Sequence, residues 1–192
     1  AADGRQSLYS RNYTWSTVHP RLQFTGRTAV LRRNYRSTEE IARAASEVLG
    51  EASPEDGPGP QGGIHGPVPI LLRGGPPAKE SEWVARFIRQ MAAHLRMKVS
   101  SAAVLVPTNQ IGEAIAGDLQ RQGLQATFFK GRELDLKAEV VKVMTLYSAK
   151  GLEFPIVAIA GFRQGTSRTR ESFGDDDAYR EWLDDQRKVL YV

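Results

Sequence analysis

Two apolar runs rich in β-branched residues, at positions 140–144 (VVKVM) and 156–159 (IVAI), predict neighbouring strands in the last third of the chain. Runs of this length beside a glycine are typical of strands in a sheet that is buried on both faces. A polar turn from Thr145 to Glu153 separates the two runs and contains two hydroxyls, a lysine, a glycine and a glutamate. Because ligands of open α/β sheets bind at the carboxyl ends of the strands, this turn is a candidate site. The alternative is a surface connection whose charges are only solvated.

The rest of the chain alternates between strand and helix patterns. Short apolar runs predict strands at 28–32, 69–72, 102–106 and 125–129, and periodic apolar positions predict helices at 38–49, 78–97 and 175–192. Thr108 or Asn109 caps a further helix that Gly123 ends, and Ser37 with Glu40 forms a capping box before the first helix. This alternation predicts an α/β fold with a doubly wound, mainly parallel sheet and helices on both faces. Residues 53–67, rich in glycine and proline, are expected to form a flexible loop.

The composition excludes several kinds of chemistry. The chain of 192 residues has no cysteine, which rules out disulfides, thiolate metal sites and cysteine nucleophiles. Its three histidines are scattered, so we expect no metal site. A formal net charge of +4 permits nucleic-acid binding through phosphate contacts. No apolar run approaches the roughly 20 residues that a membrane span needs, so we expect a soluble, cytoplasmic protein.

Aromatic residues alternate with arginines in the first 27 residues. Tyr9, Tyr13 and Trp15 lie among Arg5 and Arg11. Rings that stack on bases, beside guanidinium groups that hold phosphates, suit a surface for single-stranded nucleic acid. The alternative is a strap whose aromatic side chains pack onto the domain.

The turn after the first apolar run closely resembles a helicase motif. Residues Thr145 to Phe154 read TLYSAKGLEF. This resembles motif V, T-x-H-x-A-K-G-L-E-F, of the UvrD/Rep/PcrA group of superfamily 1 DNA helicases. Tyr147 stands where the family mostly has histidine, which changes one side chain that the family turns toward DNA.

Three other segments resemble motifs of the same family, in the same order along the chain. DGRQSLY at 3–9 resembles motif III, with Arg11 in place of a tryptophan, and LRRNYRS at 31–37 resembles motif IV. QRKVLYV at 186–192 resembles the opening of motif VI, and the chain stops before the arginine of that motif. We therefore expect a piece of a longer protein.

The resemblance implies a RecA-like fold and a division of the chain. Residues 1–27 would be the tail of a first RecA-like domain, and residues 28–192 would be the second RecA-like domain, truncated within motif VI. The extra domain that longer members insert between motifs IV and V would be absent, or reduced to the loop at 53–67.

The resemblance also implies roles for individual residues. Gln6 and Arg36 would act in catalysis, Gln6 by sensing the terminal phosphate of ATP and Arg36 by contacting the γ-phosphate. Tyr35 would stack on adenine, Gly151 would line the nucleotide cleft, and Glu153 would lie near the ribose. The residues expected on the DNA side are Tyr9, Arg11, Trp15, Thr145, Tyr147, Ser148 and Lys150.

The function that the resemblance implies is an ATP-dependent DNA helicase or translocase of the DNA-repair type, with an expected 3′ to 5′ polarity. Its cofactor would be ATP with Mg²⁺, and its partners would be single-stranded or partly duplex DNA and an N-terminal RecA-like domain in cis. This sequence contains no G-x-x-x-x-G-K-[ST] loop and no acidic pair after a strand, so the chain alone should not hydrolyse ATP.

Two other classes of function remain open at this point. The first is a non-catalytic, helicase-like module that binds DNA or a protein. The second is an unrelated enzyme of small-molecule metabolism with a doubly wound fold, since the fold alone does not determine function. The occurrence of several helicase-like motifs in the right order argues against this second class.

Overall fold

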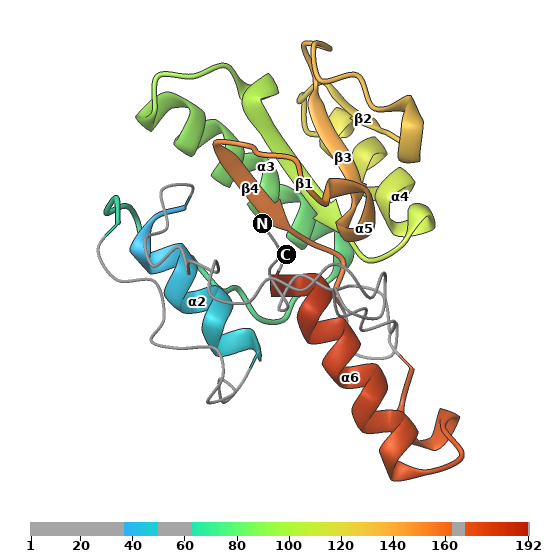
Figure 1. Cartoon of the computed structure of the whole chain (residues 1–192). Helices are drawn as coiled ribbons and strands as arrows, with labels where there is room; N and C mark the ends of the chain where they lie inside the picture. Colours follow the sequence, from blue (N-terminus) through green and yellow to red (C-terminus); the bar gives the residue numbers. More distant parts are fainter. Residues whose placement is uncertain (1–36, 50–62, 163–167, 192) are drawn as a thin grey trace, which may run out of the picture. The chain divides into compact units, whose positions relative to one another are not determined.

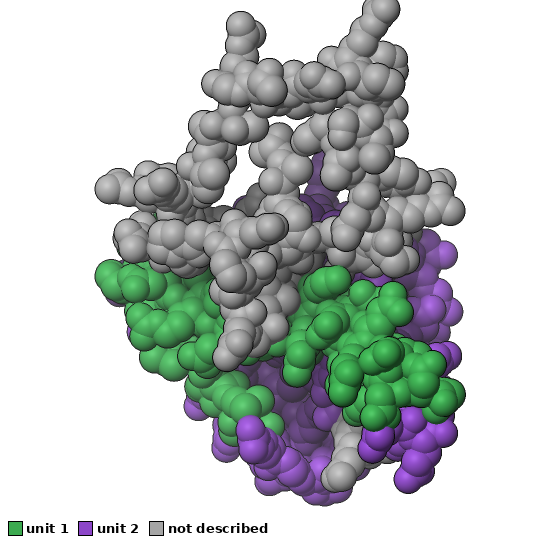
Figure 2. Space-filling model, turned by 60° about the horizontal axis from the view of Figure 1, so that its bottom comes forward, with its two compact units in different colours: residues 1–72, 173–192 green, residues 73–172 purple. Residues whose placement is uncertain are grey.

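The computed structural model describes residues 37–49, 63–162 and 168–191 (Figure 1). The chain forms two compact units, one of residues 73–172 and the other of residues 1–72 with 173–192 (Figure 2). The strand predicted at 28–32 and the domain boundary predicted at residue 27 lie outside the described residues.

The unit of residues 73–172 is built on a four-stranded sheet. Its strands are β1 (Ala102–Val106), β2 (Ala126–Phe128), β3 (Val141–Thr145) and β4 (Ile156–Ile159). They lie in the order β2-β3-β1-β4, and every pairing is parallel. The predicted α/β class with a parallel sheet is confirmed.

Two long helices of this unit pack on the same face of the sheet. They are α3 (Pro77–His94) and α4 (Asn109–Arg121), which lie beside one another (Figure 1). The predicted apolar stripe of α3 supplies Val84 and Ile88 to the core, and α4 supplies Ile115 and Leu119. These side chains meet the alternate strand residues that point to that face, including Val104, Val106, Val141 and Val143. The placement of helices on the opposite face stays a prediction.

The chain passes from β1 to β2 through α4, and all four strands end at the same edge of the sheet. After β1 the chain runs through α4 to β2, which is separated from β1 by β3. Gly123 follows α4 with a φ of 76°, a left-handed conformation that glycine adopts without strain, as the predicted helix end requires. Because all four strands are parallel, their carboxyl ends lie at one edge of the sheet.

The two apolar runs that form β3 and β4 differ in burial. The first four residues of β3, at positions 141–144, are buried, as a strand covered on both faces should be. In β4, by contrast, Val157 is 40% exposed and Ile159 is 50% exposed. The expectation that both runs are buried on both faces is therefore wrong for β4, which pairs with β1 on one side and is the last strand of the four-stranded order.

The strand predicted at residues 69–72 is also wrong. This segment has no strand pairing, and Ile70, Leu71 and Leu72 are 57–75% exposed. Pro69, the first residue of the run, lacks the backbone N–H that a sheet ladder needs, and Pro67 lies just before it, so this segment is a poor strand.

Two helices belong to the other unit. They are α2 (Glu39–Leu49) and α6 (Asp176–Tyr191), and they pack against one another. In α6 the ring centroids of Tyr179 and Trp182 lie 6.0 Å apart, and each lies 5.5 Å from the ring of Phe173. In the described part of the chain, no helix has the length and apolar character needed to cross a membrane.

A buried lysine ties two loops to β3. Lys142 is only 5% exposed, and its ammonium donates hydrogen bonds to the carbonyl oxygens of Ser100 at 2.8 Å and Ala138 at 2.7 Å. Burial lowers the pKa of Lys142 from its ordinary 10.5, although the carboxylates of Asp135 and Glu139 oppose the shift. The two carbonyls stabilise the buried charge by hydrogen bonding.

A matched pair of glycines in α4 tests the helix–sheet contact. A Cβ at Gly112 would lie 2.3 Å from the ring of Phe128, whereas a Cβ at Gly117 would make an ordinary contact at 3.6 Å with the side chain of Arg121. We expect Gly112→Ala to lower the free energy of unfolding by about 1–3 kcal/mol through overpacking. Gly117→Ala should raise it by about 0.5–1 kcal/mol, since alanine favours a helix. Urea unfolding of both variants checks this, and equal effects would contradict the close contact.

The pH dependence of stability tests the burial of Lys142. Because its folded-state pKa is lowered, the unfolded chain binds more protons just below pH 10.5, so stability rises with pH in that window. The difference in unfolding free energy between wild type and Lys142→Met should therefore grow in favour of wild type as pH approaches 10.5. Lys98→Met is the control, because Glu139 raises the pKa of Lys98 and its contribution should be constant below 10.5. The same flat profile for both variants would show that Lys142 is not buried as a cation.

Candidate functional site

The candidate turn starts at the carboxyl edge of the sheet. Val106 and Thr145, the last residues of β1 and β3, are partners in the parallel register, so the chain leaves both strands at neighbouring points. After β1, Thr108 caps α4 by accepting a hydrogen bond from the N–H of Ile111 at 3.3 Å. After β3, the chain enters the one-turn helix α5 (Leu146–Ala149). Two threonine-capped helix starts therefore follow adjacent strands.

The hydroxyls of Thr145 and Ser148, both predicted on the DNA side, are hydrogen-bonded to each other. The Oγ1 atom of Thr145 accepts a hydrogen bond from the N–H of Ser148 at 3.2 Å and lies 2.9 Å from the Oγ atom of Ser148. Either hydroxyl can donate in that contact, and the other O–H then remains able to donate elsewhere. The pair thus fixes the start of α5 and still offers one donor to an acceptor such as a phosphate oxygen.

Gly151 turns the chain out of α5. Lys150 leaves the helical conformation with a ψ of 123°, and Gly151 follows with a φ of 82°. A Cβ built at Gly151 would meet no atom of the described residues within 4 Å. Glycine is therefore required here by backbone conformation and not by crowding, and open space lies beside the backbone, where a ligand can approach closely.

Six predicted site residues come together in this turn. Tyr147 is 51% exposed, and Lys150 and Glu153 are also exposed, whereas the side chains of Thr145 and Ser148 are half-buried. The six residues are Thr145, Tyr147, Ser148, Lys150, Gly151 and Glu153. The other predicted site residues, Gln6, Tyr9, Arg11, Trp15, Tyr35 and Arg36, lie outside the described residues and stay predictions.

A glutamate that the sequence patterns did not single out holds the end of β4. The Oε1 atom of Glu80, in the first turn of α3, accepts a hydrogen bond from the N–H of Gly161 at 2.7 Å. Gly161 has a φ of 85°, and a Cβ there would lie 2.4 Å from the side chain of Ile111 in α4. An acidic residue in the first turn of a helix is ordinarily explained by the helix dipole, so no local signal pointed to Glu80.

The start of α2 differs from the prediction. The helix begins at Glu39, and Thr38 caps it by accepting a hydrogen bond from the N–H of Ile41 at 3.3 Å. The predicted capping box of Ser37 and Glu40 is wrong, because the carboxylate of Glu40 binds the N–H of Gly66. The residues just after the motif IV-like segment are thus tied to a stretch of chain 26 positions away.

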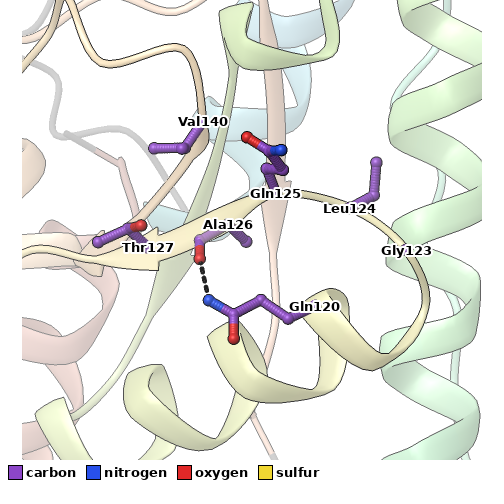
Figure 3. Close-up of a pocket in the computed structure, with 7 residues that line it drawn as sticks. All are labelled: Gln120, Gly123, Leu124, Gln125, Ala126, Thr127 and Val140. Atoms are coloured by element: carbon purple, nitrogen blue, oxygen red, sulfur yellow. Dashed lines mark hydrogen bonds between the residues drawn. The ribbon is translucent and has the colours of Figure 1, made fainter.

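A shallow pocket lies at the amino ends of β2 and β3, opposite the edge that carries the candidate turn. It has a volume of about 400 Å³ and is lined mainly by residues 123–127 together with Gln120 and Val140 (Figure 3). The side-chain amide of Gln120 donates to the carbonyl oxygen of Ala126 at 2.7 Å. The pocket contains no residue of the predicted site. Within the described ranges, no group of three or more histidines, aspartates or glutamates could hold a metal ion.

Comparison with known protein families decides what kind of domain this is. The model of the UvrD-like helicase C-terminal domain matches residues 29–135, which is more than half of the chain. The chain belongs to the UvrD-like helicase C-terminal domain family. The match contains the motif IV-like segment, β1, α4 and β2, and it ends before the motif V-like turn.

Two curated relatives share part of this UvrD-like domain. The chain is 36% identical over 52 residues to DNA helicase II of Rickettsia typhi and 38% identical over 52 residues to the ATP-dependent DNA helicase PcrA of Leuconostoc citreum. Each match covers 27% of this chain, but only 8% and 6% of the respective relatives. The matched stretch thus spans only a small part of two much longer proteins.

A solved structure supports the fold. The C-terminal domain of a possible DNA helicase from Lactobacillus plantarum WCFS1 superimposes with a TM-score of 0.56 at 22% identity, and the match covers 82% of this chain and 78% of that chain. At this level of identity the likeness concerns the fold alone.

Two substitutions at Gly151 test the geometry of the turn. Because its φ of 82° is left-handed, Gly151→Ala should lower the free energy of unfolding by about 1–2 kcal/mol. Gly151→Asn should cost less, since asparagine adopts this conformation more readily than alanine. Urea unfolding of the two variants provides the comparison. Equal stability of the alanine variant and wild type would mean that Gly151 does not have a left-handed backbone.

Proposed function

We propose that this UvrD-like domain is the second motor domain of an ATP-dependent DNA helicase or translocase. It contributes one wall of an ATP cleft and part of a single-stranded DNA path, and it does not hydrolyse ATP alone. The observation that carries this proposal is the motif V-like turn, which places six candidate residues at the carboxyl edge of a parallel sheet beside the end of β1. The family of the chain and the names of its two helicase relatives support the same function.

The nucleotide side of the site consists of Gln6, Tyr35, Arg36, Gly151 and Glu153 in this proposal. Of these, the structure describes Gly151 and Glu153. The open space beside the backbone of Gly151 and the exposed carboxylate of Glu153 fit a bound nucleotide, because a phosphate or ribose can approach a backbone that has no side chain in the way. Arg36 would supply positive charge to the γ-phosphate, which is the principal electrostatic need in phosphoryl transfer.

ATP and Mg²⁺ would be held mainly by an N-terminal RecA-like domain. Phosphoryl transfer requires a phosphate-binding loop and carboxylates that hold the metal. This sequence has no such loop, so in this proposal those parts would come from another domain in cis. Binding of ATP would then draw the two domains together, because residues from both would contact the same phosphates.

The DNA side of the site consists of Tyr9, Arg11, Trp15, Thr145, Tyr147, Ser148 and Lys150. The exposed ring of Tyr147 provides a surface on which a base can stack, and the ammonium of Lys150 suits a phosphate. The O–H of the Thr145–Ser148 pair that is not used between them would donate a second hydrogen bond to the sugar–phosphate backbone of the DNA. A 3′ to 5′ direction of movement is part of the proposal.

Turnover of ATP by the parent protein, with its upstream domain present, tests the proposal. Single-stranded DNA should stimulate ATP hydrolysis, and Arg36→Ala should reduce kcat by about a thousand-fold, as is typical of an arginine that contacts the transferred phosphoryl group. Arg86→Ala is the matched control, because it removes the same charge from an exposed position on α3.

Each alternative outcome has a definite meaning. If the parent protein binds DNA and never hydrolyses ATP, the chain is part of a non-catalytic binding module. That reading is favoured by one observation, the lack of a phosphate-binding loop in this sequence. If Arg36→Ala behaves like Arg86→Ala, the assignment of Arg36 to the γ-phosphate is wrong.

A further inference from the structure

Two exposed aromatic side chains lie at the carboxyl edge of the sheet. Tyr147 is 51% exposed and Phe162 is 44% exposed. Every other phenylalanine, tyrosine and tryptophan side chain in residues 37–49, 63–162 and 168–190 is more deeply covered. Tyr147 follows β3, and Phe162 follows β4. Tyr147 belongs to the proposed DNA side of the site, whereas the motifs of the sequence give no role to Phe162.

The chain leaves β4 beside the end of β1. The N–H of Ala160 donates to the carbonyl oxygen of Leu105 at 2.9 Å, and a Cβ at Gly161 would lie 3.3 Å from the Cδ atom of Pro107. On its other side β1 pairs with β3, whose chain continues into α5 (Figure 1). Because neighbouring strands lie about 4.8 Å apart, the two exposed rings follow strands that are about 10 Å apart. One single-stranded nucleic acid can therefore span both rings.

Two helices hold the backbone just before Phe162. Gly161 has a φ of 85°, and its N–H donates to the Oε1 atom of Glu80 in α3 at 2.7 Å. On the α4 side, a Cβ at Gly161 would collide with the side chain of Ile111. The direction in which the chain leaves β4 is thus fixed before any ligand arrives. A ring carried on such a backbone loses less conformational freedom on binding than a ring on a free loop.

The chemistry of the ring limits what it can bind. A single exposed apolar residue is common on protein surfaces and indicates nothing alone. Phe162, however, shares its edge with the exposed ring of Tyr147 and the exposed ammonium of Lys150. A phenyl ring has no hydrogen-bonding group, so it suits the face of a base and not a phosphate or the edge of a base. Rings for bases beside cations for phosphates are the usual components of a single-strand surface.

We propose that Phe162 is a second stacking platform for a base of single-stranded DNA, and that Glu80 is the residue that positions it. The inference rests on the proposed DNA side of the site, because it extends that surface from Tyr147 across the end of β1 to the end of β4. The contact adds affinity with little sequence preference, since every base has a face on which a ring can stack.

Binding of an oligothymidylate to the parent protein, with its upstream domain present, tests the proposal. Phe162→Ala should raise Kd by about 5-fold to 100-fold, as expected for the loss of one stacked base. The dependence of Kd on salt concentration should not change, because a phenyl ring neutralises no phosphate. Phe162→Trp should bind as tightly as wild type, and the oligothymidylate should quench the emission of the added indole.

A control variant removes an equally exposed apolar side chain elsewhere in the same unit. Leu136 is 53% exposed and lies in the loop that enters β3, at the opposite edge of the sheet. Leu136→Ala should therefore retain the wild-type Kd. Thermal unfolding of the parent protein identifies any variant that is not folded at the assay temperature.

The positioning role of Glu80 has a measurement of its own. Glu80→Ala should raise Kd by about two-fold to ten-fold, less than the loss of the ring, because the ring remains but is no longer held in place. It should have no further effect in the Phe162→Ala background. Glu80→Gln keeps an acceptor for the N–H of Gly161 and should recover most of the loss. Glu82→Ala removes a carboxylate that lies 3.1 Å from the ammonium of Lys79 near the start of the same helix, and it should bind like wild type.

The contrary results are distinguishable from one another. Wild-type Kd in a folded Phe162→Ala protein would overturn the inference. If that variant lost ATP turnover or thermal stability at an unchanged Kd, the ring would pack against another domain, which also overturns it. If Phe162→Ala does not fold, an indole in Phe162→Trp that is not quenched would have the same meaning. Additive effects of Glu80→Ala and Phe162→Ala would refute the positioning role. A wild-type parent protein that does not bind oligothymidylate would instead refute the proposed DNA side of the site, and the inference with it.

Discussion

The parallel pairing of β1 with β3 is the constraint on which the candidate site depends. Because the register places Val106 opposite Thr145, the two strands end together, and the polar segments that follow them start side by side. The same pairing directs alternate side chains of both strands into the core under α3 and α4. Gly112 allows α4 to approach the ring of Phe128, which keeps the helix close to the sheet. The turn after β3 is therefore carried on a rigid scaffold.

Much of the sheet unit could be predicted from local patterns. The β-branched runs indicated β3 and β4, the repeat of apolar residues indicated α3, and Thr108 with Gly123 marked the limits of α4. These features depend on neighbours in the sequence, so composition and spacing reveal them. The run at 69–72 misled because its apolar residues suggested a strand, while Pro69 lacks a backbone donor that pairing needs. The exposure of β4 depends on strand order, which local patterns do not contain.

In the candidate site, too, local features could be predicted from the sequence and tertiary contacts could not. The six residues of the motif V-like turn were predictable together because they lie within one short stretch, Thr145 to Glu153, and the family resemblance gave each one a role. The bond between Thr145 and Ser148 follows from the short helix between them. The contact of Glu80 with Gly161 joins residues 81 positions apart, and that of Glu40 with Gly66 joins residues 26 positions apart. Such pairs depend on the tertiary fold, and a single sequence carries no record of them.

The exposure of β4 has a consequence for handling the isolated chain. Its sequence, IVAI, contains no charged residue or proline, and its outward side chains Val157 and Ile159 are about half exposed. Natural edge strands usually carry lysine, proline or a bulge, which discourage pairing with another molecule. Within the part of the chain that the structure describes, β4 therefore offers apolar side chains and an outer edge to another molecule, so self-association of these 192 residues at high concentration would depend on this strand.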